Sequence, residues 1–162
     1  MGQFGLVRID DRLIHGQVMA LWTKHLQAKR IVIVDDQVAK DSFLQTVLRG
    51  AAPPGISVEV YSVEQAPTAL QRPEGERAKT IVLMKGPKTA IALCSAGVVL
   101  DILNVGGMGA GPGRKQFFRN ISATAEELEM FRRLEEMGVT SQIQIEPNAR
   151  AISVASLLPQ KS

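Results

Sequence analysis

The sequence predicts an α/β fold with an open, doubly wound, mostly parallel sheet that carries helices on both faces. Two observations support this prediction. Short apolar runs rich in β-branched residues recur along the chain, and segments with helical periodicity separate them. Repeated strand–helix–strand units of this kind form parallel sheets with right-handed crossovers. The length of 162 residues fits a single domain that spans residues 1–162.

Five apolar runs are the predicted parallel strands, because continuous apolar runs are typical of strands buried on both faces. These runs lie at about 4–9, 30–34, 56–61, 79–84 and 99–105. The helical patterns between them lie at about 16–27, 37–50, 63–71 and 87–96.

The C-terminal part of the chain has different signals. Thr124-Ala125-Glu126-Glu127 forms a capping box that begins a helix, and Gly138 ends this helix. Polar and apolar residues alternate at about 140–146, which indicates a strand at a sheet edge or with one half-exposed face. We expect one antiparallel strand near the C-terminus, and a last short helix over 149–158.

Composition excludes several classes of protein. Hydrophobic residues make up 45% of the chain and charged residues 22%, which excludes disorder and solenoid repeats. The net charge of +3 is modest, and no basic run is interleaved with aromatic residues, so we expect no nucleic-acid binding. The single cysteine, Cys94, lies in an apolar pattern and cannot form an intrachain disulfide, which indicates a buried inert thiol and a cytosolic protein.

Membrane insertion is not expected from the sequence. Charged residues begin by Arg8 without a preceding long apolar region, so no signal peptide is visible. The longest apolar stretches are shorter than the ~20 residues that a membrane-spanning helix needs. Any association with a membrane is therefore expected to come through a partner.

A dense group of charged residues surrounds one histidine near the N-terminus. Residues 8–17 read Arg8-Ile9-Asp10-Asp11-Arg12-Leu13-Ile14-His15-Gly16-Gln17. This run lies between a predicted strand and a predicted helix, where open α/β folds place their chemistry. Imidazole can act as a nucleophile, base or acid near neutral pH, and arginine forms paired hydrogen bonds with phosphate oxygens. A helix N-terminus adds free N–H donors.

These residue types suit a histidine that accepts a phosphoryl group. Arg8 or Arg12, with the N–H groups of Ile14, His15, Gly16 and Gln17, could stabilise charge on the phosphoryl oxygens. Asp10 is the candidate that orients the imidazole or holds an arginine. Asp11 is expected to be exposed and to contact a partner. The alternative is a surface turn whose charges pair with one another.

Residues 8–18, together with Asn104-Val105-Gly106-Gly107-Met108, resemble the IIB subunits of the mannose/fructose/sorbose family of the bacterial sugar phosphotransferase system (PTS). The resemblance covers nearly the whole chain and also includes 52–55, 112–116 and the helix at about 124–138. It implies that His15 accepts a phosphoryl group on Nδ1 from a phosphohistidine of the IIA protein or domain. It also implies that His15 passes this group to a sugar bound by the membrane subunits IIC and IID.

The resemblance thus implies a protein-N(pi)-phosphohistidine–sugar phosphotransferase without a cofactor or metal. It would be cytoplasmic and peripheral to the membrane through IIC and IID. The transported sugar does not follow from the sequence, because specificity in this family resides mainly in the membrane subunits. Two rival classes are a hydrolase such as a histidine phosphatase, and a regulatory or sensor protein of the same fold with a phosphorylatable His15.

Residues 106–113 hold five glycines, yet their spacing matches neither the dinucleotide-binding nor the phosphate-loop motif. They are either a flexible turn or, as the resemblance suggests, a segment where Gly106 and Gly107 let the backbone approach the histidine loop. Several family members carry bulkier residues at the positions of Gly109 and Ala110, so this chain departs from the family there.

Four other residues are candidates with simpler explanations. Lys85 follows the fourth predicted strand and could line the same crevice as His15. Asp35 and Asp36 follow the second strand and fit a helix N-cap better than a metal site. His25 and Trp22 are interpreted as ordinary helix and core residues.

Overall fold

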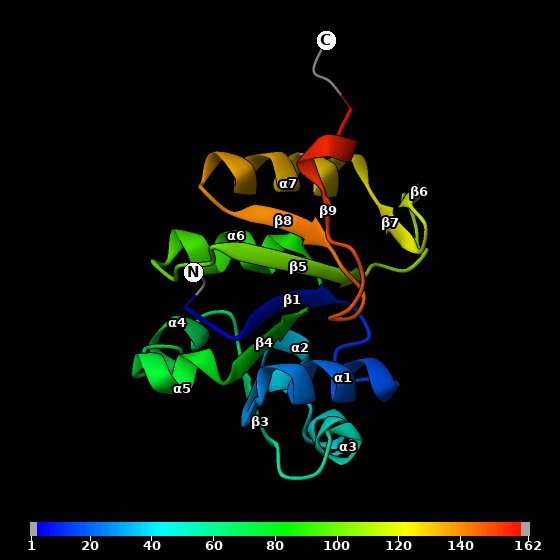
Figure 1. Ribbon diagram of the computed structural model, residues 1–162. Helices are drawn as coiled ribbons and strands as arrows, with labels where there is room; N and C mark the ends of the chain where they lie inside the picture. The colour runs from blue at the N-terminus through cyan, green and yellow to red at the C-terminus, as the bar shows by residue number, and fades with distance from the viewer. Residues whose placement is uncertain (1–2, 160–162) are drawn as a thin grey trace.

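The computed structural model describes residues 3–159 and contains a seven-stranded sheet and a separate two-stranded one (Figure 1). The main sheet has the spatial order β3 (Ser57–Tyr61), β2 (Arg30–Val34), β4 (Thr80–Met84), β1 (Leu6–Asp10), β5 (Ile102–Gly107), β8 (Thr140–Ile143) and β9 (Ile152–Ser153). Only β9 is antiparallel to its neighbour in this sheet. The predicted single-domain α/β fold is confirmed, including the antiparallel strand near the C-terminus.

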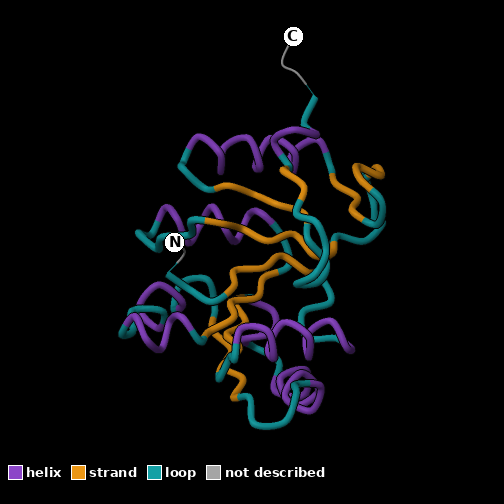
Figure 2. The backbone as a smooth tube through the Cα atoms, in the orientation of Figure 1, coloured by secondary structure: helices purple, strands orange, loops and turns teal. Residues whose placement is uncertain are grey.

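Helices cover both faces of the sheet (Figure 2). On one face lie α1 (Gly16–Leu26), α2 (Asp36–Ala39) and α3 (Ser42–Ala51), and on the other lie α4 (Ala66–Ala69), α6 (Pro87–Ser95) and α7 (Ala125–Glu136). Each set packs on its own apolar cluster. The first cluster includes Trp22 and Leu48, and the second includes Leu93 and Phe131. The short helix α5 (Glu74–Ala78) precedes β4.

Most predicted strands and helices are present with shifted ends, and some helices differ from the prediction. The pattern at 37–50 is two helices, because Asp35 accepts a hydrogen bond from the Val38 N–H and Asp41 from the Leu44 N–H. A second N-cap begins a new helix there. Asp35 therefore has the capping role that the sequence indicated. The pattern at 63–71 contains only the four-residue α4, and α5 was not predicted.

The predicted last helix over 149–158 is wrong. This segment contains β9, which pairs with β8, followed by the short 3-10 helix η1 (Ala155–Leu157). Pairing of β9 with β8 satisfies backbone groups that an edge strand would leave open. Consequently β8 is paired on both sides, and its alternating pattern reflects faces of unequal burial rather than a sheet edge.

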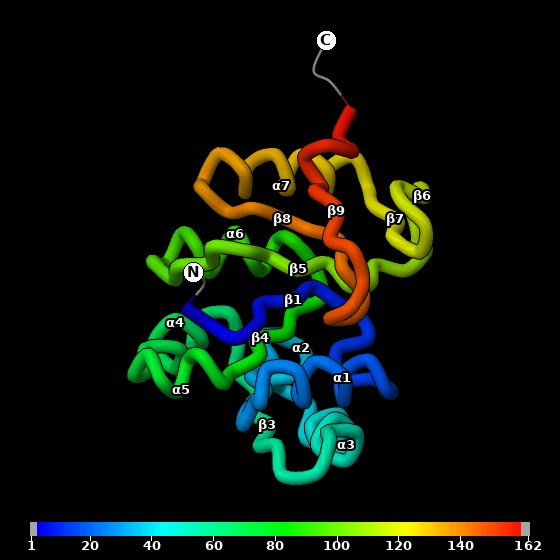
Figure 3. The backbone as a smooth tube through the Cα atoms, viewed as in Figure 1, coloured from blue at the N-terminus to red at the C-terminus, as the bar shows by residue number. Residues whose placement is uncertain are grey.

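The two-stranded sheet was not predicted. Strands β6 (Lys115–Phe118) and β7 (Ile121–Ala123) form an antiparallel hairpin after the glycine-rich segment, at the end of the molecule toward which β5 and β8 run (Figure 3). The capping box of α7 is confirmed, since Thr124 and Glu127 exchange side-chain hydrogen bonds with each other's backbone N–H. Gly138 follows α7 with a φ of +87°, as a helix-ending glycine does. Within residues 3–159, no helix has the length and apolar character needed to cross a membrane.

Candidate active site around His15

The site forms at the carboxyl end of β1. The chain leaves β1 for α1 on one face of the sheet, whereas the neighbouring strands β4 and β5 lead to α6 and α7 on the other face. Connections that diverge in this way open a crevice at the carboxyl ends of the strands. His15 lies at this point as the N-cap residue of α1, with an extended backbone and a side chain that makes no capping hydrogen bond. Its imidazole is 24% exposed.

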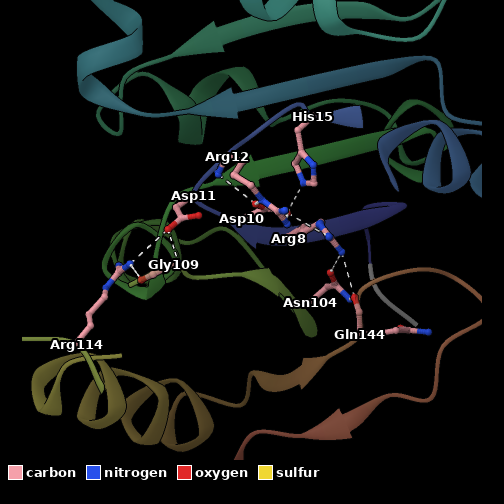
Figure 4. A network of polar contacts seen from close by, with 9 residues as sticks. All are labelled: Arg8, Asp10, Asp11, Arg12, His15, Asn104, Gly109, Arg114 and Gln144. Carbon is pink, nitrogen blue, oxygen red and sulfur yellow. Dashed lines mark hydrogen bonds and ion pairs between the residues drawn. The ribbon is translucent and has the colours of Figure 1, made fainter. Parts of the chain in front are cut away.

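Asp10, the last residue of β1, connects the charged side chains of this loop (Figure 4). Its Oδ2 atom lies 2.9 Å from Nε2 of His15, and it accepts hydrogen bonds from Arg12 at 3.1 Å and Arg8 at 3.2 Å. Its Oδ1 atom accepts from Nε of Arg12 at 3.0 Å and from the backbone N–H of Arg12 at 3.1 Å. The two roles considered for Asp10, imidazole orientation and arginine binding, are thus combined in one carboxylate.

Asp10 is ionised despite its complete burial. Burial opposes the charged form, but the hydrogen bonds from Arg12 and His15 and the charge of Arg8 outweigh it, so the pKa of Asp10 is lowered. An ionised carboxylate only accepts hydrogen bonds. In the neutral imidazole of His15 the proton therefore belongs on Nε2, which leaves a lone pair on Nδ1.

Arg12 combines a fixed position with exposure. Its guanidinium contacts both carboxylate oxygens of Asp10, while 49% of the side chain remains accessible. A guanidinium has five N–H donors, and Asp10 receives only part of this set. Arg12 can therefore bind an incoming anion without leaving Asp10.

Arg8 has a different position, and the prediction that it could contact a phosphoryl group is wrong in this conformation. Its side chain is 0% exposed. One guanidinium nitrogen donates to Asp10, and another donates to Asn104 Oδ1 at 2.7 Å and to the Gln144 carbonyl at 3.1 Å. The Trp22 ring covers the guanidinium, with 5.8 Å between Cζ and the ring centroid. A side chain without accessible surface cannot reach a group on another protein, so Arg8 supports Asp10.

Gly106 and Gly107 leave room for the two arginines. A Cβ atom on Gly106 would lie 2.0 Å from Cζ of Arg8, and one on Gly107 would lie 2.9 Å from Nη2 of Arg12 and from Oδ1 of Asp10. Only glycine allows the arginines to cross β5 this closely. This geometry favours the close-approach interpretation of the glycine pair over a flexible turn.

Asp11 is paired within the chain while 28% of its side chain remains exposed, and its contact with a partner stays a prediction. Its Oδ2 atom accepts from the Gly109 N–H at 2.8 Å and lies 3.4 Å from a guanidinium nitrogen of Arg114. Arg114 also donates to the Gly109 carbonyl and makes two hydrogen bonds with Glu127, which raise the pKa of Arg114. Asp11 therefore joins the histidine loop to the glycine-rich segment.

The remaining candidates differ in their surroundings. Ile14 is buried in the apolar cluster under α1, while Gly16 and Gln17 are exposed in the first turn of this helix. First-turn N–H groups have no carbonyl partner within a helix. Lys85 follows β4, and its Nζ atom lies 3.7 Å from Oδ2 of Asp35, with which it forms an ion pair. A functional role for Lys85 stays a prediction.

The residues interpreted as structural behave accordingly. Trp22 is buried against the sheet, and His25 meets the edge of its ring. Cys94 is partly rather than fully buried, a correction to the expected buried thiol, but this burial still raises the pKa of its thiol and disfavours the reactive thiolate.

A family model described as "PTS system sorbose subfamily IIB component" matches residues 4–162. The chain belongs to this family. As a IIB component of the sugar phosphotransferase system, it takes part in phosphoryl transfer during sugar uptake, and IIB components are phosphotransferases.

Relatives of this IIB component agree with the assignment in sequence and in structure. The sorbose-specific EIIB component of Klebsiella pneumoniae is 36% identical over 94% of this chain and 93% of its own length. Its IIB domain structure superposes with a TM-score of 0.87 over 95% of this chain and 94% of that structure. The mannose-specific EIIAB component of Escherichia coli K12 is 35% identical over 86% of this chain and 43% of its own length.

Sequence reasoning assigned no role in the site to four residues that build it. Asn104, Gln144 and Trp22 surround Arg8, and Arg114 holds Asp11. Asn104 and Arg114 lie in segments that carried the family resemblance, which was the one available signal. The Gln144 contact uses a backbone carbonyl, so the identity of its side chain could not have indicated it.

Proposed function

We propose that His15 carries the phosphoryl group of this IIB component on Nδ1. The observation that supports this proposal is the 2.9 Å contact between Nε2 and the ionised Asp10. It directs the lone pair of the neutral ring to Nδ1. The nucleophile is then presented at the N-terminus of α1, beside a half-exposed arginine.

In the proposed step, Nδ1 of His15 attacks the phosphorus of a phosphohistidine on the IIA protein or domain. The new N–P bond forms as the N–P bond to the donor histidine breaks, and the electron pair returns to the donor ring. Arg12 and the first N–H groups of α1 stabilise charge on the three equatorial oxygens. Arg8 holds Asp10, and Asp10 keeps the imidazole in the reactive tautomer.

A second transfer then delivers the phosphoryl group to a sugar bound by the membrane subunits IIC and IID. In this proposal the IIB component works at the cytoplasmic side of the membrane and reaches the bilayer through these subunits. The name EIIAB of the Escherichia coli relative joins an A and a B component in one protein. This supports a IIA domain as the donor.

The decisive experiment uses the two histidines of the chain as a matched pair. Wild type, His15→Ala and His25→Ala are incubated with a phosphorylated IIA protein of this family, and intact mass is measured after acid and after base treatment. We expect acid-labile, base-stable label on wild type and His25→Ala only, with ¹⁵N NMR placing it on Nδ1. Equal labelling of His15→Ala, or no labelling of wild type by a proven cognate donor, would exclude His15 as the carrier.

Replacing Arg12 tests the proposed phosphoryl contact. We expect Arg12→Ala to slow transfer from IIA about 100-fold, because loss of one preorganised donor costs about 10²–10³ in rate. Arg12→Lys should retain part of the rate, since lysine keeps the charge and loses the planar fork. Quench-flow labelling measures both variants, with the exposed Arg49→Ala on α3 as the control. Unchanged kinetics in Arg12→Ala would remove Arg12 from the site.

The two rival classes give different products. A hydrolase would release free phosphate from the labelled protein without an acceptor, and a sensor would not phosphorylate sugar when IIC and IID are present. No contact within residues 3–159 favours either rival over the carrier.

A further inference from the structure

Arg8 is held from the side opposite Asp10 by Asn104 on β5 and by the backbone of Gln144, the residue that follows β8. Its Nη1 atom donates to Asn104 Oδ1 at 2.7 Å and to the Gln144 carbonyl at 3.1 Å. The side-chain amide of Asn104 donates to the same carbonyl at 3.0 Å. These three groups form a closed triangle of hydrogen bonds at the buried end of the arginine (Figure 4).

The Gln144 carbonyl is itself fixed in place. The Gln144 side chain donates to the carbonyls of Pro147 and Ala149, which closes the loop after β8 on itself. The next carbonyl, of Ile145, accepts from Nε1 of Trp22 at 2.9 Å. The loop is therefore anchored to α1, the helix that begins at His15.

We propose that Asn104 is a positioning residue for phosphoryl transfer, acting on His15 through Arg8 and Asp10. The inference rests on the proposed function of His15. A single oxygen, Oδ2 of Asp10, contacts both Arg8 and Nε2 of His15. Displacement of Arg8 would therefore change the charge and position of the atom that orients the imidazole.

The chemistry of Asn104 fits this role better than a packing role. The residue is buried on β5 between Leu103 and Val105, and those two neighbours belong to the apolar cluster on the other face. Asparagine is disfavoured in strands, and burial of an amide costs free energy unless it is hydrogen-bonded. Both polar atoms of Asn104 are used, one on Arg8 and one on the carbonyl that also binds Arg8.

The test compares Asn104→Leu, Asn104→Asp and the control Leu103→Ala in the full chain. Leu103→Ala removes a buried side chain of the same strand on the opposite face, so it weakens the fold without touching Arg8. Two quantities are measured for the folded proteins. One is kcat and KM for transfer from phosphorylated IIA, and the other is the tautomer fraction of His15 from long-range ¹H–¹⁵N NMR.

We expect Asn104→Leu to lower kcat about tenfold or more with an unchanged KM for IIA, because the comparable partners that orient metal-ligating histidines contribute about 10–100-fold. The Nε2–H tautomer fraction of His15 should fall with it. Asn104→Asp keeps an oxygen that can accept from Arg8 but loses the donor to the Gln144 carbonyl, so it should regain only part of kcat and of the Nε2–H tautomer fraction. Leu103→Ala should match wild type in both.

An unchanged tautomer fraction and kcat in Asn104→Leu would overturn the proposal, as would an equal loss in Leu103→Ala. If Asn104→Leu does not fold, Asn104→Ser replaces it, since the short serine hydroxyl cannot reach Arg8. The same comparison of kcat and of the His15 tautomer fraction then tests the proposal. The tautomer measurement needs no donor. A failure of the proposed function, seen as no labelling of wild-type His15, is therefore distinct from a failure of Asn104 to orient the ring.

Discussion

Asp10→Asn is expected to destabilise the protein by ~3–5 kcal/mol and to slow phosphoryl transfer by at least ~100-fold. The cost in stability arises because Asp10 is the ionised partner of Arg8, and both side chains are fully buried. Breaking a buried ion pair by removing one member leaves the other charge uncompensated. Urea unfolding followed by circular dichroism measures this difference.

The loss of rate in Asp10→Asn has a separate cause. The amide that replaces the carboxylate can donate a hydrogen bond to Nε2 of His15, which would favour the tautomer with the proton on Nδ1. That tautomer has no lone pair on the nitrogen proposed to attack phosphorus. NMR of the ring nitrogens should therefore show a reversed tautomer preference in this variant.

The stability effect of Asp10 also depends on pH with a definite sign. Because the folded state lowers the pKa of Asp10, its ionisation stabilises the protein above the unfolded-state pKa of about 3.9, and this contribution is lost as pH falls through the lower folded-state value. The difference in unfolding free energy between wild type and Asp10→Asn should therefore shrink below about pH 4. Asp101→Asn, which removes the same charge at the amino end of β5, is the control. A difference that stays constant down to pH 2 would contradict the assignment of an ionised Asp10.

Gly106→Ala is expected to destabilise the protein by at least about 3 kcal/mol and to lower the transfer rate, although it adds a single methyl group. The added Cβ would lie 2.0 Å from Cζ and Nη2 of Arg8, and a fully buried arginine has no solvent to move into. The guanidinium must shift away from Asp10 or β5 must separate from β1. Either change disturbs the carboxylate that orients His15.

Two other glycines provide the comparison for Gly106→Ala. Gly50→Ala places a methyl group in α3 with nothing within 4 Å, so this variant should be as stable as wild type or gain ~0.5–1 kcal/mol. Gly107→Ala should cost less than Gly106→Ala, because its added Cβ would lie 2.9 Å from Nη2 of Arg12 and from Oδ1 of Asp10, a much milder overlap than 2.0 Å. A Gly106→Ala protein with wild-type stability and rate would show that Arg8 need not occupy the observed position.

Some features of the fold depend on local patterns and could be predicted for that reason. The apolar runs for β1 to β5 and the capping box of α7 depend on residues within a few positions of one another. The predicted last helix failed because the strand β9 forms only when β8 lies beside it. The break between α2 and α3 was missed because Asp41 begins a second helix inside one continuous helical pattern.

The sequence by itself determined the fold class and the content of the site: a histidine at a strand-to-helix turn, with arginines and carboxylates beside it and a glycine pair on another strand. Only the tertiary structure decided which role each of these residues has in the site. The sequence around Arg8 and Arg12 does not distinguish the roles of the two arginines. Arg8 is buried because Asn104, 96 residues away, and Gln144, 136 residues away, lie against it. The order β1-β5-β8 brings these residues together. The hydrophobic periodicity of a segment indicates its own secondary structure and buried face. The neighbours of a strand in the sheet depend instead on the packing of the entire chain.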